Sequence, residues 1–215
     1  MRDLTRRSLL GFGFGSLVLA ACGSRSSTAS PAPRDALVPT THIDDEDDLP
    51  PVPMACVSVA TAKNIEGPFY KKGAPHRSVL VDPSDPGERL RLTGVLQTTR
   101  CEPIGGATID VWQANAAGDY DNDTFRFRGV LTTDKKGRYD LRTLVPGRYM
   151  NGDRYRPAHI HIKVRAAGYS TLTTQLYFAG DPYNDGDPFI DDSLIMQHTV
   201  ENEIRRARFD FVLPA

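Results

Sequence analysis

Two histidines separated by a single residue are the strongest chemical feature of this sequence. They lie in residues 156–161 (RPAHIH). On a β-strand, alternate side chains project from the same face about 7 Å apart at their Cα atoms, so His159 and His161 can converge on one metal ion. Taken alone, such a pair is also compatible with ordinary core or surface histidines. No cysteine or third histidine lies nearby in the sequence, which argues against a zinc cage of nitrogen and sulfur donors.

Tyrosines in predicted loops offer oxygen donors to complete such a site. Tyr120 follows residues 111–119 (VWQANAAGD), which end a predicted strand, and Tyr149 closes the loop sequence 146–149 (PGRY). Tyr155 also precedes the histidines and competes with Tyr149 for this role.

The elements that must position these residues are strands. Short runs of alternating apolar residues follow one another from about Leu90, separated by Gly-rich and Asp-rich turns, and they predict an all-β protein folded as an antiparallel β-sandwich. Trp112, Tyr139 and Tyr177 are interpreted as packing residues on these strands. At most short helices are expected, one of them over residues 193–206 with Asp191 and Asp192 near its N-terminus. The clearest strand runs are 107–112, 138–141, 159–164, 172–178 and 209–213.

Composition restricts the class of protein further. The chain has 215 residues, with 26 basic and 27 acidic side chains and a formal net charge of −1. This balance argues against a nucleic-acid partner, and no apolar run reaches the roughly 18 residues of a membrane-spanning helix. The length suits one folded domain, predicted over residues 54–215.

The first 53 residues have the composition of an export signal followed by a linker. Residues 1–21 combine a basic start, which includes a twin-arginine pair, with a short apolar stretch, and they predict an export signal. Residues 19–22 (LAAC) resemble a lipobox, so Cys22 is the predicted lipid anchor; the alternative is an ordinary cleaved signal. Residues 22–53, rich in Ser, Pro and acid, predict an unstructured linker. Its acidic run, Asp44–Asp48, is interpreted as a solvated spacer rather than a cation site.

These segments imply export to the cell envelope or periplasm, with membrane contact only through the lipid. In an oxidising compartment the two remaining cysteines, Cys56 and Cys101, are predicted to form a disulfide; two separate buried thiols are the alternative.

Seven segments in a fixed order resemble the intradiol ring-cleavage dioxygenases, a family that includes protocatechuate 3,4-dioxygenase, catechol 1,2-dioxygenase and hydroxyquinol 1,2-dioxygenase. Residues 111–120 look especially like the protocatechuate branch. The segments are EGPFY (66–70), VWQANAAGDY (111–120), TD with a following Gly137 and Tyr139 (133–139), PGRY (146–149), RPAHIH (156–161), LTTQ (172–175) and FAGD (178–181).

The resemblance implies a non-haem ferric site. Carried over by matched position, the Fe(3+) ligands are Tyr120, Tyr149, His159 and His161. Arg156 and Gln175 take the places of the family's active-site arginine and glutamine, and Tyr149 that of its released, proton-accepting tyrosine, which favours Tyr149 over Tyr155. Fe(III) is a hard ion that favours anionic oxygen, which agrees with two phenolates.

The implied reaction is cleavage of a catechol between its two hydroxylated carbons with O2, giving a muconate-type dicarboxylate. The alternative is a lipid-anchored β-sandwich binding module without turnover. The catechol and hydroxyquinol branches of the family carry an N-terminal helical dimerisation region, and the matching stretch here is predicted to be the signal and linker. The sequence leaves open which catechol is used and whether the protein acts alone or as a homo-oligomer.

Overall fold

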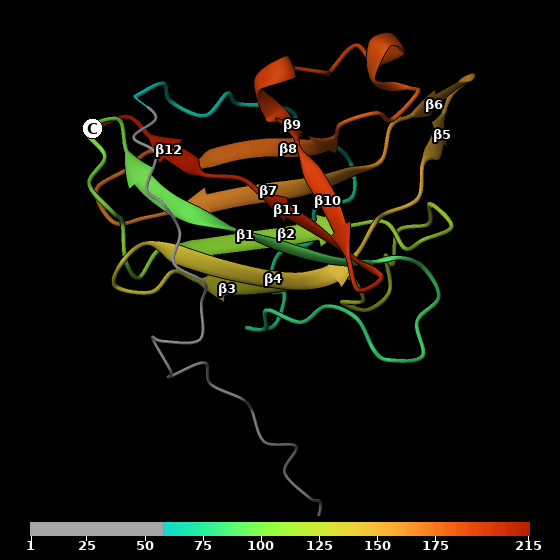
Figure 1. The fold of residues 1–215 in the computed structure, drawn as a ribbon, viewed down its shortest axis with the longest axis horizontal. Coiled ribbons are helices and arrows are strands. Elements are labelled where there is room, and N and C mark those ends of the chain that lie inside the picture. Colours follow the sequence, from blue (N-terminus) through green and yellow to red (C-terminus); the bar gives the residue numbers. More distant parts are fainter. Residues whose placement is uncertain (1–57) are drawn as a thin grey trace, which may run out of the picture. The chain divides into compact units, whose positions relative to one another are not determined.

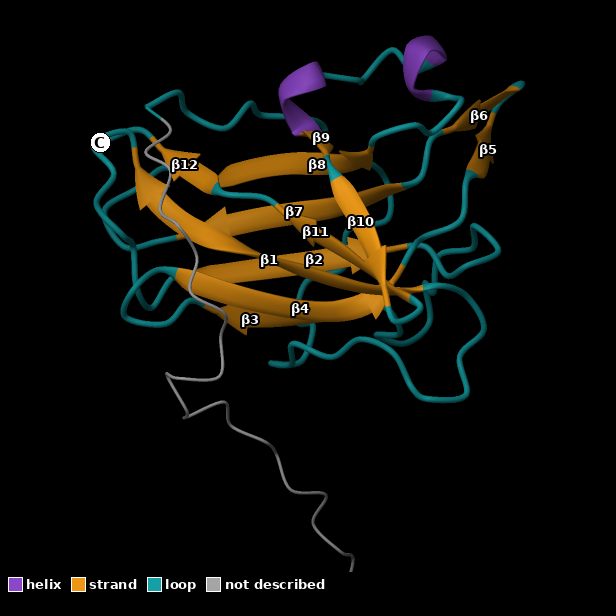
Figure 2. Ribbon diagram, in the orientation of Figure 1, coloured by secondary structure: helices purple, strands orange, loops and turns teal. Residues whose placement is uncertain are grey.

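The computed structural model of the protein describes residues 58–215. This part of the chain folds almost entirely into strands, as the sequence predicts (Figures 1 and 2). The strands are β1 (Arg89–Thr98), β2 (Thr108–Gln113), β3 (Arg128–Thr132), β4 (Arg138–Leu144), β5 (Tyr149–Asn151), β6 (Arg154–Arg156), β7 (His159–Arg165), β8 (Leu172–Phe178), β9 (Ile195–Met196), β10 (His198–Glu201), β11 (Ile204–Arg208) and β12 (Phe211–Leu213), with two single-turn 3-10 helices, η1 (Asn184–Gly186) and η2 (Asp192–Leu194).

The strands form two sheets and a separate hairpin. One sheet has the order β10-β11-β1-β12, with β4 on the other edge of β1; the second has the order β3-β2-β7-β8-β9. The two sheets overlie each other in Figure 1, where the hairpin of β5 and β6 projects at one end. One apolar core joins buried side chains from both sheets, so the predicted β-sandwich is confirmed.

Alternation along each strand explains how the core forms. In β1, Leu90 and Leu92 are buried, whereas Arg89 and Arg91 face away from the core. In β7 the isoleucines and the valine enter the core, so the residues between them project from the opposite face of the sheet. The predicted metal ligands His159 and His161 project from this second face.

Three strand pairings are parallel, which an all-antiparallel sandwich does not include. β11 and β12 pair with successive halves of β1, and β9 pairs with β8. Between β11 and β12 the chain steps around Gly94, where a Cβ atom would lie 1.8 Å from the carbonyl oxygen of Phe209. Only glycine tolerates so close an approach of the two backbones.

The helix predicted over residues 193–206 is wrong. Only the single turn η2 forms, and Asp191 accepts a hydrogen bond from Ser193 at its start. The rest forms β9, β10 and the start of β11. Asn202 and Glu203 have φ values of 50° and 64°, which makes a tight two-residue hairpin turn, and pairing with β1 then stabilises the extended chain.

The predictions for residues 1–21 and 22–53, for the anchor Cys22 and for Cys56 lie outside the described residues, so the Cys56–Cys101 pairing stays a prediction. Within residues 58–215 no helix is long and apolar enough to cross a membrane.

Candidate metal centre

The two histidines of β7 meet on the face of the sheet that points away from the core. Their Nε2 atoms are 3.2 Å apart, and both side chains are buried. Nδ1 of His159 lies 2.8 Å from the carbonyl oxygen of Pro157, and because a carbonyl only accepts, this nitrogen carries the proton. Nε2 of His159 therefore carries the lone pair, which is the tautomer that a metal ligand requires.

Two tyrosines reach the same point, Tyr120 from a loop and Tyr149 from the start of β5. The hydroxyl of Tyr120 is 3.5 Å from Nε2 of His159, and the ring centre of Tyr149 is 5.6 Å from those of Tyr120 and His159. Tyr155 instead has a side chain that is 48% exposed, and its ring lies 5.4 Å from that of Tyr183. The structure thus brings Tyr149, and not Tyr155, to the histidines.

Residues 64–70 and Trp112 line the candidate metal centre. The ring of Phe69 stacks on that of Tyr120 at 4.2 Å, and Trp112 stacks on His161 at 4.9 Å with the rings nearly parallel. Gly67 has a φ of +70°, and a Cβ atom there would lie 3.6 Å from Nε2 of His161. A larger residue at this position would occupy the space beside that nitrogen.

Arg156 lies next to the tyrosine and histidine cluster and is buried. Its Nη1 is 3.5 Å from both the hydroxyl of Tyr149 and Nε2 of His159. Its Nε donates to Asp187 over 2.7 Å, and the side chain of Asp187 is fully buried. Burial alone would lower the pKa of Arg156, but the bond to Asp187 raises it above its ordinary value, so the guanidinium is charged.

Gln175 and Tyr177 hold the other side of this guanidinium. Nη2 of Arg156 donates to the amide oxygen of Gln175 over 3.0 Å and to the hydroxyl of Tyr177 over 3.2 Å. The β7–β8 register places Gln175 directly beside His161, and its amide nitrogen donates to the carbonyl of Ile65. Describing Tyr177 as a packing residue was therefore incomplete, because its hydroxyl belongs to the polar network.

Arg128 is a second arginine with almost no exposure. It donates to the carbonyl of Phe69 over 2.6 Å and twice to the carbonyl of Asp121, at 2.7 and 3.1 Å. Among residues 58–215 it has no carboxylate within ion-pair distance. Arg128 thus joins the segment that carries Phe69 to the loop that carries Tyr120.

The electrostatics of the cluster suit a cation of high charge. Burial and the charge of Arg156 lower the pKa of His159 to about 4, and burial together with His159 lowers the pKa of His161, so both imidazoles are neutral ligands. Burial, reinforced by neighbouring Tyr149, raises the pKa of Tyr120 above its ordinary value. This phenol ionises at neutral pH only if a cation is bound beside it.

The donor set itself defines which metal fits. In the described part of the chain no three His, Cys, Asp or Glu side chains gather in one place, so phenols must complete any site built on the two histidines. Two hard, anionic phenolates together with two neutral imidazoles suit a trivalent ion such as Fe(III). The residues present fit the group that the family resemblance implies.

Comparison with known proteins places the chain in a family. The profile of the family described as "Dioxygenase" (Dioxygenase_C) matches residues 65–215. The chain belongs to the intradiol ring-cleavage dioxygenase family, and the resemblance inferred from the sequence motifs is confirmed.

Curated relatives agree with this assignment. A chlorocatechol 1,2-dioxygenase of Rhodococcus opacus is 37% identical in an alignment 153 residues long, which covers 59% of this chain and 60% of that enzyme. A chlorocatechol 1,2-dioxygenase of Pseudomonas putida is 33% identical in an alignment 179 residues long, which covers 73% of this chain and 69% of that enzyme. The chain spans about half to two thirds of the length of such relatives.

Solved structures give the same result. The dioxygenase domain of a dioxygenase–carbohydrate-binding fusion from Streptomyces sp. SirexAA-E superposes with a TM-score of 0.70 at 41% identity, covering 73% of this chain and 99% of that one. The 3-chlorocatechol 1,2-dioxygenase of Rhodococcus opacus gives a TM-score of 0.67 at 28% identity, covering 72% of each chain. The likeness to the protocatechuate branch stays a prediction.

Sequence reasoning missed two residues of the site. Asp187 comes after a long loop with no periodic pattern, and Arg128 starts a strand where an exposed arginine is usual.

Proposed function

We propose that the protein is a ferric-iron-dependent intradiol dioxygenase, which cleaves a catechol between its two hydroxylated carbons with O2 and forms a muconate-type dicarboxylate. The observation that carries this proposal is the convergence of Tyr120, Tyr149, His159 and His161 from three separate segments of the chain. The names of the relatives support a catechol or chlorocatechol as the class of substrate.

Tyr120, Tyr149, His159 and His161 would hold the metal. Ferric iron, when bound, supplies a Lewis acid that stabilises phenolates and the deprotonated oxygens of a catechol.

The side chains around the ligands have separate tasks. In its phenolate form, the Tyr149 oxygen would accept a proton from one catechol hydroxyl as the substrate binds. The charged guanidinium of Arg156, 3.5 Å from that oxygen, stabilises the electron-rich ring. Gln175 and Asp187 hold this guanidinium from two sides, and Gly67 leaves room for a flat ring beside His161.

The first test is spectroscopic. Tyrosinate bound to ferric iron absorbs visible light, so the iron-loaded protein is expected to be reddish-brown and to consume O2 when catechol is added. Iron-loaded protein that is colourless and takes up no O2 would overturn the proposal and favour a binding module.

A pair of neighbouring tyrosines provides a matched test of the ligand assignment. Tyr149→Phe is expected to shift the visible band and abolish turnover, whereas Tyr155→Phe, on the adjacent strand of the same hairpin, is expected to change neither. Tyr120→Phe and His161→Ala are expected to lose iron, measured as metal content after dialysis. Full iron occupancy in those variants would refute the ligand set.

Substrate identity is tested with a panel of catechol, chlorocatechol, protocatechuate and hydroxyquinol. Oxygen uptake and the ultraviolet spectrum of each product give the relative kcat/KM and show whether cleavage is intradiol. Preference for catechol or chlorocatechol would agree with the curated relatives, and preference for protocatechuate with the motif at residues 111–120.

The proposal includes export to the cell envelope and anchoring through acylated Cys22. The basic start, the apolar stretch and the LAAC sequence of residues 1–22 support it. Mass spectrometry of the N-terminal peptide tests it, because a lipid on Cys22 adds a large, defined mass and Cys22→Ser removes it. The oligomeric state is tested by light scattering.

A further inference from the structure

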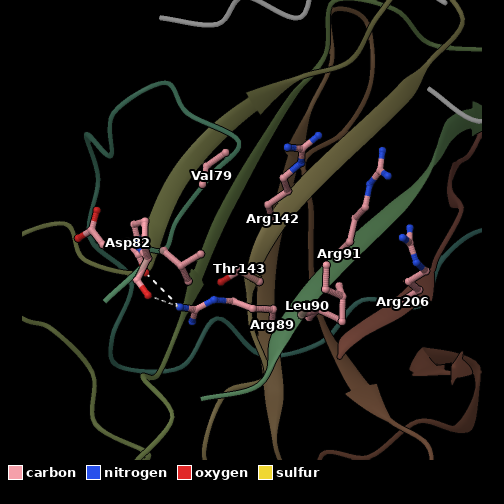
Figure 3. Close-up of a pocket in the computed structure, with 11 residues that line it drawn as sticks. Val79, Asp82, Arg89, Leu90, Arg91, Arg142, Thr143 and Arg206 are labelled. Atoms are coloured by element: carbon pink, nitrogen blue, oxygen red, sulfur yellow. Dashed lines mark hydrogen bonds between the residues drawn. The ribbon is translucent and has the colours of Figure 1, made fainter. Parts of the chain in front are cut away.

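A groove rich in arginine lies on the sheet that does not carry the metal centre. It has a volume of about 510 Å³ and opens on the side of β1, β4 and β11 that faces away from the core. Figure 3 shows the side chains of Arg91, Arg142 and Arg206 projecting side by side from these strands. None of the residues that line the groove belongs to the metal centre.

The three arginines form one row across neighbouring strands. The register pairs Arg91 with Arg142 on one side and with Arg206 on the other. The exposed Val79 continues the row beyond Arg142 through an isolated bridge. Like charges directly opposite one another destabilise a sheet, so this row requires negative charge nearby.

The carboxylates that face this row are fewer than the guanidinium groups. Asp140 lies 2.8 Å from Arg91 and 3.7 Å from Arg142, and Glu201 lies 2.9 Å from Arg206. Among the described residues, two carboxylates therefore pair with the three arginines of the row. Arg142 has only the 3.7 Å contact with Asp140, which also pairs with Arg91.

A fourth arginine increases the excess of positive charge in the groove. Nη2 of Arg89 donates to the carbonyl oxygens of Asp82, Pro83 and Asp85, which carry no full charge. The carboxylates of Asp82 and Asp85 pair with Arg126 instead. The groove thus presents net positive charge above partly apolar walls.

We propose that the acidic run Asp44–Asp48 of this same chain docks in the groove. The run has five carboxylates in succession, complementary to the arginine row. On this proposal the run has a binding role in addition to that of a spacer.

The acidic run is close enough along the chain. The amide of Thr61 donates to the carbonyl of Val212, and Val212 pairs with Gln97 of β1. Arg91 is six residues from Gln97 along β1, so Thr61 and Arg91 are roughly 22 Å apart from strand spacing and rise. Thr61 comes thirteen residues after Asp48, and thirteen steps along an extended chain span at most about 45 Å.

A tethered segment has an advantage over other anions. Attachment to the same chain gives the run an effective concentration in the millimolar range, so a free anion in dilute solution competes poorly with it.

Proteolysis tests the docking directly, because the run contains four sites for a protease that cuts before aspartate. In about 0.02 M salt, the full chain is expected to be cut in this run about fivefold more slowly than the variant R142Q/R206Q. At about 0.5 M salt, which screens exposed charges, the two rates are expected to agree. Arg142 is exposed and Arg206 is half-buried outside the apolar core, so the variant is expected to keep its fold.

The control is R100Q/R154Q, which removes the same charge from two exposed arginines elsewhere and is expected to keep the slow rate. Equal cleavage of all three proteins at low salt would overturn the proposal. The proposal would also be overturned if, at low salt, R142Q/R206Q were cut in the acidic run as slowly as the unaltered chain.

A second arm identifies the occupant. Neutralising the run (D44N/D45N/E46Q/D47N/D48N) is expected to shift the NMR signals of Arg142 and Arg206 side chains in the otherwise unaltered chain. Unchanged signals would refute docking of this segment, and if a short polyglutamate peptide shifted them instead, the groove would belong to an external acidic partner.

Discussion

Removing the carboxylate of Asp187 is expected to destabilise the protein strongly, although the residue touches none of the four proposed ligands. Asp187 and Arg156 form an ion pair of 2.7 Å, with side-chain exposures of 0% and 5%. Truncating one partner of a buried pair leaves an uncompensated charge and costs about 3–5 kcal/mol. Arg156 keeps its bonds to Gln175 and Tyr177, so we expect the lower end for Asp187→Ala, about 3 kcal/mol.

Urea unfolding of the metal-free protein measures this cost. With a slope of about 2 kcal/mol per molar urea, the midpoint is expected to fall by about 1.5 M. Asp185→Ala, at an exposed position two residues away, is the control and is expected to leave the midpoint unchanged. Because Asp187 also orients Arg156, turnover should fall even where the variant is fully folded. A urea midpoint of Asp187→Ala within about 0.2 M of that of the unaltered protein would refute the inference that the Asp187–Arg156 ion pair stabilises the fold.

Three further outcomes follow from buried polar groups. Arg128→Met, which removes the link between the Phe69 segment and the Tyr120 loop, should cost about 2–3 kcal/mol and speed hydrogen exchange in residues 65–70 and 120–124; unchanged exchange would show that the link is dispensable. Tyr139→Phe loses a 2.7 Å, partly buried bond to the carbonyl of Phe209 and should cost about 1–2 kcal/mol in urea unfolding, and no change would mean that water replaces the bond. Burial and Arg156 lower the pKa of His159 to about 4, whereas in the unfolded chain this histidine takes up a proton below about pH 6.5. The free energy of unfolding of the metal-free protein should therefore fall by about 3 kcal/mol between pH 6.5 and 4. In His159→Gln the free energy of unfolding should fall by less over the same pH range.

Local pattern was sufficient for the fold class and for part of the site. Alternation with a period of two is a property of each strand on its own, so the β-rich domain and the same-face geometry of His159 and His161 could be predicted from neighbouring residues. The family motifs then identified Tyr120, Tyr149, Arg156 and Gln175, which the structure brings together around the histidines.

Tertiary structure decided the features that depend on contacts between distant segments. Residues 195–206 form strands because pairing with β1 and a tight turn outweigh a weak helical tendency. Asp187 and Arg128 acquire their roles from partners 31 and 59 residues away in the sequence. The arginine row exists only in the register of three strands, and no local pattern contains that register. Burial and long-range pairing are properties of the folded chain, which is why spacing along the sequence did not reveal them.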